Sequence, residues 1–392
     1  MDYTDGVSRS LAPTSLMLGN VVTGMSVLAP AGMLLQLSTE FGVSVRDAGL
    51  LITFGAIALC IGSPLTAWLT SRIERRILLA LTLAILAITN LASAFAPDYM
   101  TLLIIRIVML SVGALFTPQA AGTVGLIVPD GKRGSAIAYV FLGWSVAAAV
   151  GLPLITLLAS RVGWREAYLC IGLIAAASTI LLAWRLPRGL FGAPVDLKTW
   201  ADLFQNRMIV LLLLVTVLQM SGQFVVFTFI GPILAQLTGA SPEGIGLVFA
   251  LYGVFGFVGI AIATRIVDGW GPFRTSLLSA TMVLSGLVVW AVGAGSYTIM
   301  AIGMAVWGLG FASTNSMQQV RLVGAAPALA GASVALNTSA LYVGQAIGSA
   351  IGGALLAHGA FVAPGYVGSV FGVIAVLVVI ATRPKPTTTV SD

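Results

Sequence analysis

Long apolar runs recur along the whole 392-residue chain, separated by short breaks that are polar or rich in proline and glycine. Most runs approach the ~20 residues that an α-helix needs to cross the ~30 Å hydrocarbon core of a bilayer. The runs are continuous rather than alternating, which excludes the strands of a transmembrane β-barrel. We therefore predict an all-α membrane protein with 12 transmembrane helices. The spans are predicted near residues 14–36, 48–69, 77–95, 99–122, 134–158, 166–185, 208–236, 244–264, 274–293, 297–318, 328–357 and 362–381.

Composition excludes a water-soluble protein. Hydrophobic residues make up 58% of the chain and charged residues only 8%, whereas about a quarter of an average soluble domain is charged. The 2 cysteines, Cys60 and Cys170, lie in apolar runs without a CxxC pair or a neighbouring histidine. They indicate neither a disulfide framework nor a metal site, so we predict no metal and no cofactor.

Lysine and arginine are distributed unevenly between the two sides of the predicted membrane. With a cytoplasmic N-terminus, only Arg46, Arg161 and Arg165 lie outside and Arg106 lies within a span, while the other 15 of the 19 basic residues lie inside. Because positively charged loops remain in the cytoplasm, we predict a multi-pass protein of the bacterial inner membrane with both termini cytoplasmic. The basic residues are spread over short loops, so the net charge of +6 does not indicate nucleic-acid binding.

The chain is predicted to consist of two six-helix halves, residues 1–185 and 207–392, joined by a cytoplasmic linker at 186–206. The linker is rich in proline and glycine and then places Leu197, Trp200, Leu203 and Phe204 on one helical face. This pattern predicts an amphipathic turn at the membrane surface, and a docking helix for a partner protein is the alternative. A polar, arginine-containing turn follows both the second and the eighth span, so the halves echo each other, as alternating access by rocking requires.

The turn after the second span, residues 67–76, reads AWLTSRIERR. It resembles the loop pattern G-x-L-A-D-R-x-G-R-R of the major facilitator superfamily, with Arg72, Arg75 and Arg76 matching and Ser71 in place of the aspartate. In the second half, Asp268 and Gly271 keep the D-x-x-G spacing.

The resemblance implies that Arg72, Arg75, Arg76 and Asp268 latch the two halves together on the cytoplasmic side. With Ser71 in place of the acid, the first-half latch should be weaker. The alternative is that these arginines only determine topology.

Two further motifs fall in the fourth and fifth spans. Arg106 lies about seven residues, or ~10 Å, into span four, where a guanidinium is costly unless it faces water or a partner. It resembles the span-four arginine of the superfamily, which implies a role in substrate or proton coupling, and snorkelling to the outer interface is the alternative. In span five, Gly151 and Pro153 resemble the antiporter signature G-x-x-x-G-P with one inserted residue, and a proline there loosens the backbone where a gate must bend.

Residues 62–66, 96–99 and 163–165 extend the resemblance over nearly the whole chain. The chain is similar to the drug:proton antiporter-1 branch of the superfamily, particularly to bacterial arabinose-efflux-like and purine-efflux-like permeases. The resemblance implies the major facilitator fold with pseudo-two-fold symmetry, export of a small molecule, usually against proton entry, and a monomer.

A substrate site in such a protein lies near the midplane between the halves, and uncharged polar side chains occur at that depth. Amides facing lipid would lack partners, so we expect them to face the interior, where hydrogen bonding between helices is the alternative role. With Arg106, they would suit a neutral or anionic sugar-like or polar-aromatic substrate. The candidate residues are Asn20, Thr23, Arg106, Gln219, Gln223, Phe227, Asn315, Asn337 and Tyr342.

None of the 13 acidic residues lies in the middle of a predicted span, whereas many antiporter relatives hold a carboxylate in span one. Protons could instead act through edge groups such as Glu40, Asp98 or His358, or the protein could be an uncoupled facilitator or an importer. A membrane-embedded sensor or channel is the alternative of another class. Because no catalytic constellation is present in the sequence, we predict no enzyme activity. No nucleotide-binding loop is present either, so we do not expect ATP to be the energy source.

Overall fold

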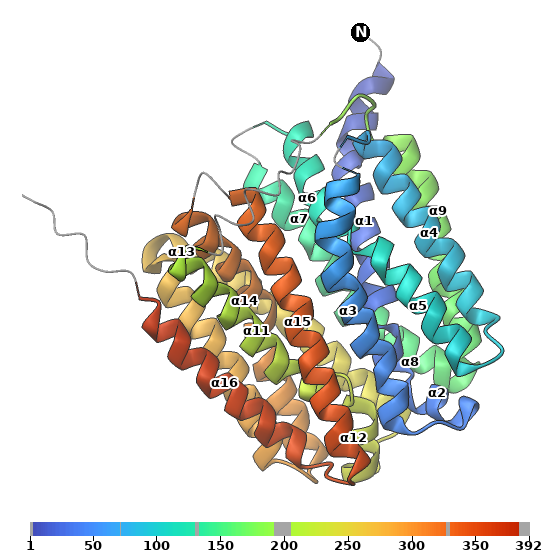
Figure 1. Ribbon diagram of the computed structural model, residues 1–392, viewed down its shortest axis with the longest axis vertical. Coiled ribbons are helices and arrows are strands. Elements are labelled where there is room, and N and C mark those ends of the chain that lie inside the picture. Colours follow the sequence, from blue (N-terminus) through green and yellow to red (C-terminus); the bar gives the residue numbers. More distant parts are fainter. Residues whose placement is uncertain (1–2, 71, 130–132, 192–204, 327–329, 384–392) are drawn as a thin grey trace, which may run out of the picture.

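The computed structural model describes the chain except residues 1–2, 71, 130–132, 192–204, 327–329 and 384–392 (Figure 1). Over the described residues the regular structure is entirely helical. The first helices are α1 (Tyr3–Gly32), α2 (Leu34–Phe41), α3 (Val45–Leu69), α4 (Arg75–Ala94), α5 (Tyr99–Gly113), α6 (Phe116–Ile127), α7 (Arg133–Val146), the π-helical turn η2 (Ala147–Gly151), α8 (Leu152–Arg161) and α9 (Trp164–Arg185). They are followed by α11 (Arg207–Phe227), α12 (Ile230–Thr238), α13 (Pro242–Val292), α14 (Tyr297–Ala325), α15 (Ala330–Ala357) and α16 (Ala363–Ala381).

Among the described residues, 11 helical segments are long and apolar enough to cross a membrane. One of them, α13, has 51 residues and bends sharply at Gly271, where φ is 78° and ψ is 158°. A positive φ suits glycine, which lacks a Cβ, and Pro272 follows directly, so α13 contains two spans joined by a tight turn. Counted in this way the structure has twelve spans, which confirms the fold class predicted from hydropathy.

Several predicted spans are interrupted. The predicted span 208–236 ends as α11 at Phe227 and resumes as α12, with Phe229 at φ −116° between them. The first span has the same form, because Met33 at φ −132° separates α1 from the short α2. Both short helices end at a left-handed glycine, Gly42 or Gly239.

The two ends of the bundle are distinguished by the chain termini. We call the end at which α1 begins and α16 ends the terminal end, and the other end, which carries α2 and α12, the far end (Figure 1). At the far end the same turn is built twice. The Tyr99 hydroxyl donates to the carbonyl of Asp47 at 2.5 Å, and the Tyr297 hydroxyl donates to that of Gly244 at 2.8 Å.

The helices α1–α9 and α11–α16 occupy opposite sides of the bundle in Figure 1, with α3 beside α15 between them. Helix α9 ends at Arg185 and α11 begins at Arg207. The division into halves at the 186–206 linker stays a prediction, and the amphipathic turn predicted for Leu197–Phe204 lies outside the described residues.

Glycine permits close helix packing within each side. On α15, Gly344, Gly348 and Gly352 form a stripe against α11, where an added Cβ would lie 2.3–2.5 Å from a backbone oxygen. On α13, a Cβ at Gly286 would lie 2.3 Å from the backbone nitrogen of Trp307 on α14. Small residues at such crossings let backbones approach in lipid, where the hydrophobic effect does not drive helices together.

We predict that Gly286→Ala lowers the free energy of unfolding by about 1–3 kcal/mol, because α13 and α14 must separate to admit the methyl group. Gly324→Ala is the matched control, since no atom lies within 4 Å of the position that its Cβ would take. The measurement is unfolding by SDS in mixed micelles. Equal stability of the two variants would contradict the packing described.

Candidate functional site

The two sides of the bundle touch through η2 and α8, which pack on α13. A Cβ at Gly253 of α13 would lie 2.2 Å from the backbone of Ala149 in η2. The π-helical turn occurs here because Pro153 has no N–H to donate to the carbonyl of Ala149. Such turns often mark functional sites, and this one contains Gly151, to which the sequence motif assigns a gating role together with Pro153.

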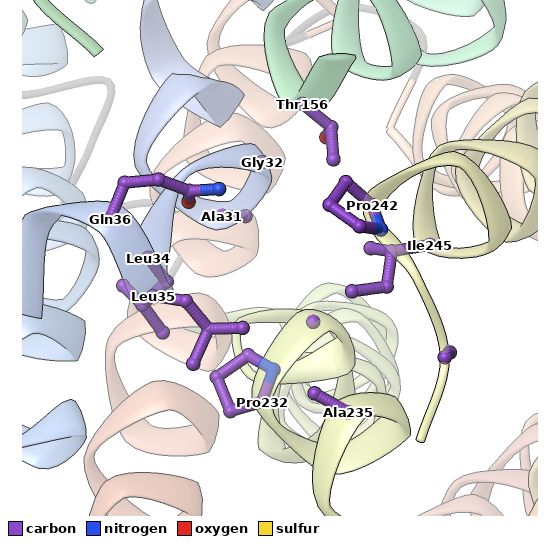
Figure 2. A pocket seen from close by; sticks show the side chains of 12 residues that line it. Ala31, Gly32, Leu34, Leu35, Gln36, Thr156, Pro232, Ala235, Pro242 and Ile245 are labelled. Carbon is purple, nitrogen blue, oxygen red and sulfur yellow. The ribbon is translucent and has the colours of Figure 1, made fainter. Parts of the chain in front are cut away.

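A hollow of about 400 Å³, including its open mouth, lies between the two sides near the far end (Figure 2). It is lined from one side by α1, α2 and α8, with Gln36 and Thr156, and from the other by α12 and α13, with Pro232 and Ile245. Most of its surface is apolar, and none of the candidate residues predicted from the sequence lines it.

An ion pair also joins the two sides at the far end. Arg161 at the end of α8 contacts Glu243 in the first turn of α13 at 2.5 Å, with side chains 72% and 48% exposed. An exposed pair is screened by solvent and contributes little stability. It therefore marks this end as closed but does not by itself hold it closed.

Arg106 on α5 is almost completely buried, at 1% exposure. Its Nε donates to the carbonyl of Leu51 at 2.7 Å, and its two terminal nitrogens donate to the carbonyls of Ser26 at 2.9 Å and Val27 at 2.6 Å. The hydroxyl of Tyr168 also lies beside the guanidinium. Arg106 thus lies in the interior and does not snorkel to the outer interface.

The carbonyl of Ser26 is available to Arg106 because of Pro30. In a regular helix that carbonyl would accept from the N–H of residue 30, which proline lacks. The guanidinium supplies the missing donor and joins α1, α3 and α5 at the level where α1 approaches its break. A buried guanidinium that donates to carbonyls of two neighbouring helices holds those helices in a fixed relative position.

On the first side, the candidate residue Asn20 forms a saturated cluster. Its Nδ2 donates to the carbonyl of Val140 at 2.9 Å, and its Oδ1 accepts from the Thr117 hydroxyl at 2.8 Å. Trp144 Nε1 donates to the same hydroxyl at 3.2 Å. Thr23 does not join the cluster, because its hydroxyl donates to the carbonyl of Gly19 in its own helix.

On the second side, Asn337 of α15 lies at the centre of a similar cluster. Its Oδ1 accepts from the Thr216 hydroxyl at 2.6 Å, and its Nδ2 donates to Oδ1 of Asn315 at 3.1 Å. The cluster joins α11, α14 and α15, as the Asn20 cluster joins α1, α6 and α7. Tyr342, a further candidate, is buried one to two turns along α15.

Gln219 and Gln223 share one face of α11 but differ in their partners. Gln223 Oε1 accepts from Trp307 Nε1 at 2.7 Å, and its Nε2 donates to the carbonyl of Gln219. The Gln219 side chain is 3% exposed, and both of its polar atoms lack a hydrogen-bond partner among the described residues. A buried amide without partners is costly, and the Gln219 side chain therefore has unused hydrogen-bonding capacity.

An aromatic cluster lies next to this amide face. The ring of Phe227 lies 5.0 Å from Tyr252, 5.7 Å from Phe249 and 6.2 Å from Trp307, and Tyr252 lies 4.8 Å from Phe311. The second side therefore offers an unpartnered amide beside apolar ring faces.

The predicted latch residues lie at the terminal end. Arg72 and Asp268 are exposed, Arg76 is half-buried and Arg75 is buried. Within the part of the chain that the structure describes, the ion pairs are Arg161–Glu243 and Arg165–Glu40, both at the far end. The latch is thus not engaged between described residues, and its role stays a prediction.

The edge groups considered for proton transfer also lie at the far end. The Asp98 carboxylate accepts from the backbone N–H and the hydroxyl of Thr101, and these bonds lower the pKa of Asp98. A carboxylate with a lowered pKa stays ionised near neutral pH, so Asp98 is a poor proton carrier. Glu40 is paired with Arg165, and His358 contacts the carbonyl of Ala354.

Several residues of these clusters, among them Thr117, Trp144, Thr216 and Trp307, were not among the candidates predicted from the sequence. The sequence contained a signal for Thr117. The spacing from Tyr99 to Thr117 equals the spacing from Tyr297 to Asn315. The two tyrosines make equivalent hydrogen bonds, so they mark equivalent positions in the two halves. Aligning the halves on these tyrosines would have matched the two polar positions.

Twelve spans, a repeated far-end turn and paired polar clusters are the features of a secondary transporter, not of an enzyme. The sequence matches the description "Major Facilitator Superfamily" over residues 16–331 and 212–392. The chain belongs to this superfamily.

Similar proteins agree with that assignment. The chain is 32% identical over 382 residues to the inner membrane transport protein YdhP of Escherichia coli (strain K12), covering 95% of this chain and 96% of that protein. It is 28% identical to a probable sugar efflux transporter of Mannheimia succiniciproducens, covering 89% and 87% of the two chains. The crystal structure of a D-xylose-proton symporter shares the fold at a TM-score of 0.76 and 18% identity, over 96% of this chain and 98% of that one.

We predict that Arg106→Lys lowers the free energy of unfolding by about 1.5–3 kcal/mol, because an ammonium cannot reach carbonyls on both α1 and α3 with the fixed geometry of a guanidinium. Introduced into a Pro30→Ala background, the same change should cost about 1 kcal/mol less, since the introduced alanine restores a donor to the Ser26 carbonyl.

The measurement is a double-mutant cycle by SDS unfolding, with Arg383→Lys, an exposed arginine, as the control. Strict additivity of the two changes would show that Arg106 does not compensate for the proline.

Proposed function

We propose that this protein exports a small, uncharged polar molecule of sugar-like character across the bacterial inner membrane by alternating access, as a member of the drug:proton antiporter-1 branch. The observation that carries the proposal is the unpartnered, buried amide of Gln219 on α11, the helix that also contributes Thr216 to the Asn337 cluster and Phe227 to the aromatic cluster. Amides pair with hydroxyl groups in both directions, and ring faces suit the apolar face of a sugar or nucleoside.

Charge supports a neutral substrate over a cationic one. In the described residues, each aspartate and glutamate lies in a connecting loop or within the first or last turn of a span or short helix. No carboxylate of the described residues therefore competes for a cationic drug at the midplane. Each of the three nitrogens of Arg106 already donates to a backbone carbonyl, which also argues against its pairing with an anionic substrate.

The relatives support the location and the direction of transport. One is named an inner membrane transport protein and another a probable sugar efflux transporter. Together with the excess of lysine and arginine at the terminal end, this supports a cytoplasmic terminal end and a periplasmic far end. In this structure the two sides meet at the far end, so substrate would enter from the cytoplasm.

The proposal also includes the roles that the family resemblance implies for residues at the terminal end. Arg72, Arg75, Arg76 and Asp268 would close the cytoplasmic side once substrate is bound, and η2 with Pro153 would bend as the far end opens. The two six-helix halves would rock about the contacts of α3 with α15 and of η2 with α13, within a single monomer.

Proton coupling is the part of the proposal with a specific rival. Antiport is favoured by the resemblance, whereas the lack of a carboxylate in the middle of the described spans favours an uncoupled facilitator. The two differ in whether substrate flux moves protons, which a transport assay separates directly.

We predict that Gln219→Ala raises the KM for export of the transported sugar or nucleoside by about tenfold, the loss of one buried hydrogen bond, and that Asn337→Ala also raises it because its bonds hold α11, α14 and α15 in position. Thr281→Ala is the control, because that hydroxyl bonds only within its own helix. The measurement is efflux of radiolabelled candidates from loaded cells, with protein amounts matched by immunoblot. Wild-type KM in both variants would remove these residues from the site.

We predict that proteoliposomes loaded with a pH-sensitive dye show substrate-dependent proton movement. The movement should persist in Asp98→Asn, because a carboxylate that stays ionised carries no proton. Substrate equilibration that ignores an imposed pH gradient would identify a facilitator instead.

A further inference from the structure

We propose that the start of α4 and the end of α9 form a binding site for the phosphate group of an anionic phospholipid at the terminal-end membrane surface. The site shares Arg75 with the predicted cytoplasmic latch but contains none of the proposed substrate contacts. Its elements are two arginines with unused donors and the chain turn after α9, which is hydrogen-bonded to the start of α4.

Arg75, the first residue of α4, carries the main observation. Its side chain is only 9% exposed, yet Nε and one terminal nitrogen have no hydrogen-bond partner among the described residues. A buried cation with unused donors is unfavourable unless a partner is supplied. Because no described group supplies one, an external anion is the simplest partner.

Arg185, the last residue of α9, provides a second unpartnered donor through its buried Nε. Helices α4 and α9 pack side by side (Figure 1), and a Cβ at Gly172 would lie 2.7 Å from Leu91. Arg75 lies about 24 Å along α4 from Leu91, and Arg185 about 20 Å along α9 from Gly172, at 1.5 Å per residue. Helices α4 and α9 are antiparallel, and both distances are measured toward the terminal end. The two arginines therefore lie at nearly the same level of the bundle.

The chain segment that follows α9 is hydrogen-bonded to the start of α4. The N–H of Gly189 donates to the Glu74 carboxylate at 2.7 Å, and the N–H of Arg75 donates to the carbonyl of Leu190 at 2.8 Å. Glu74 occupies the N-cap position of α4 without capping it through its side chain. The start of α4 thus already holds an acidic residue and a bonded N–H, so an external anion would bind through the unused donors of the two arginines.

The neighbourhood indicates a membrane phosphate. Trp184 is 76% exposed and Ile77 is 49% exposed, which places an aromatic and an aliphatic side chain outside the bundle beside the two arginines. Tryptophan is typical of the headgroup level of a bilayer, and basic pockets between helices at that level bind anionic headgroups. Arginine recognises phosphate through its planar set of donors.

The test uses the full-length protein, purified in detergent and depleted of lipid. Short-chain dihexanoyl-phosphatidylglycerol is titrated while thermal unfolding is followed, because a ligand that binds the native state raises the Tm. We expect saturable stabilisation, with the apparent Kd weakened about tenfold or more in Arg75→Gln, as expected from the loss of a charge-assisted hydrogen bond. Arg185→Gln should weaken it as well, and provides the test if Arg75→Gln does not fold.

Arg383→Gln is the matched control, since it removes one exposed charge from the same end of the bundle. An equal loss in Arg383→Gln would indicate unspecific attraction and overturn the site. Inorganic phosphate in a parallel titration separates the two sources of the group. Stabilisation by phosphate equal to that by the lipid would overturn a lipid ligand in favour of a soluble phosphate, and no stabilisation by either would overturn the proposal entirely.

Discussion

The constraint on which the rest of the structure depends is that a polar group within a bilayer must find its partner inside the protein. Arg106 is the clearest example of this constraint, because its three nitrogens donate to three backbone carbonyls of α1 and α3. Since one of those carbonyls is left free by Pro30, a charge and a proline that would each be costly alone compensate each other. The outcome is a first half in which α1 can break near Met33 without leaving backbone groups unsatisfied.

The same constraint separates structural from functional polar groups. Asn20 is saturated by Val140 and Thr117, so it holds helices together. Gln219 is buried at nearly the same fractional exposure as its saturated neighbours but lacks partners among the described residues. The asymmetry suggests that the first half serves more as scaffold and the second half supplies the free hydrogen-bonding capacity that a polar substrate needs.

Hydropathy was sufficient to predict the twelve spans because each span must cover the same hydrocarbon thickness. It could not place the interruptions at Met33 and Phe229, since apolar residues flank both breaks and only the backbone angles reveal them. Helical spacing put Asn20 and Thr23 on one face, but a shared face does not identify a partner, and Thr23 bonds within its own helix. Arg106 could be recognised as buried from its depth, whereas its carbonyl partners depend on how three helices meet.

The contact between the two sides bears on the mechanism in the same physical terms. The backbones of Gly253 and Ala149 approach closely within the spans, about 16 Å along α13 from its far-end start, while the exposed Arg161–Glu243 pair adds little at the far end itself. A contact of this kind is made by shape and can be exchanged for another of similar energy, as a rocking motion between two packed states requires.

The most direct test of alternating access is the distance between spin labels at both ends of the bundle, measured by double electron–electron resonance with Cys60 and Cys170 replaced by alanine. One pair of exposed positions, Pro97→Cys with Thr298→Cys, reports on the far end, and the other, Ile73→Cys with Gly269→Cys, on the terminal end. On adding transported substrate, we expect the far-end distance to grow and the terminal-end distance to shrink, each by about 5 Å or more. Distances that stay constant at both ends, or that change in the same direction, would contradict alternating access by rocking.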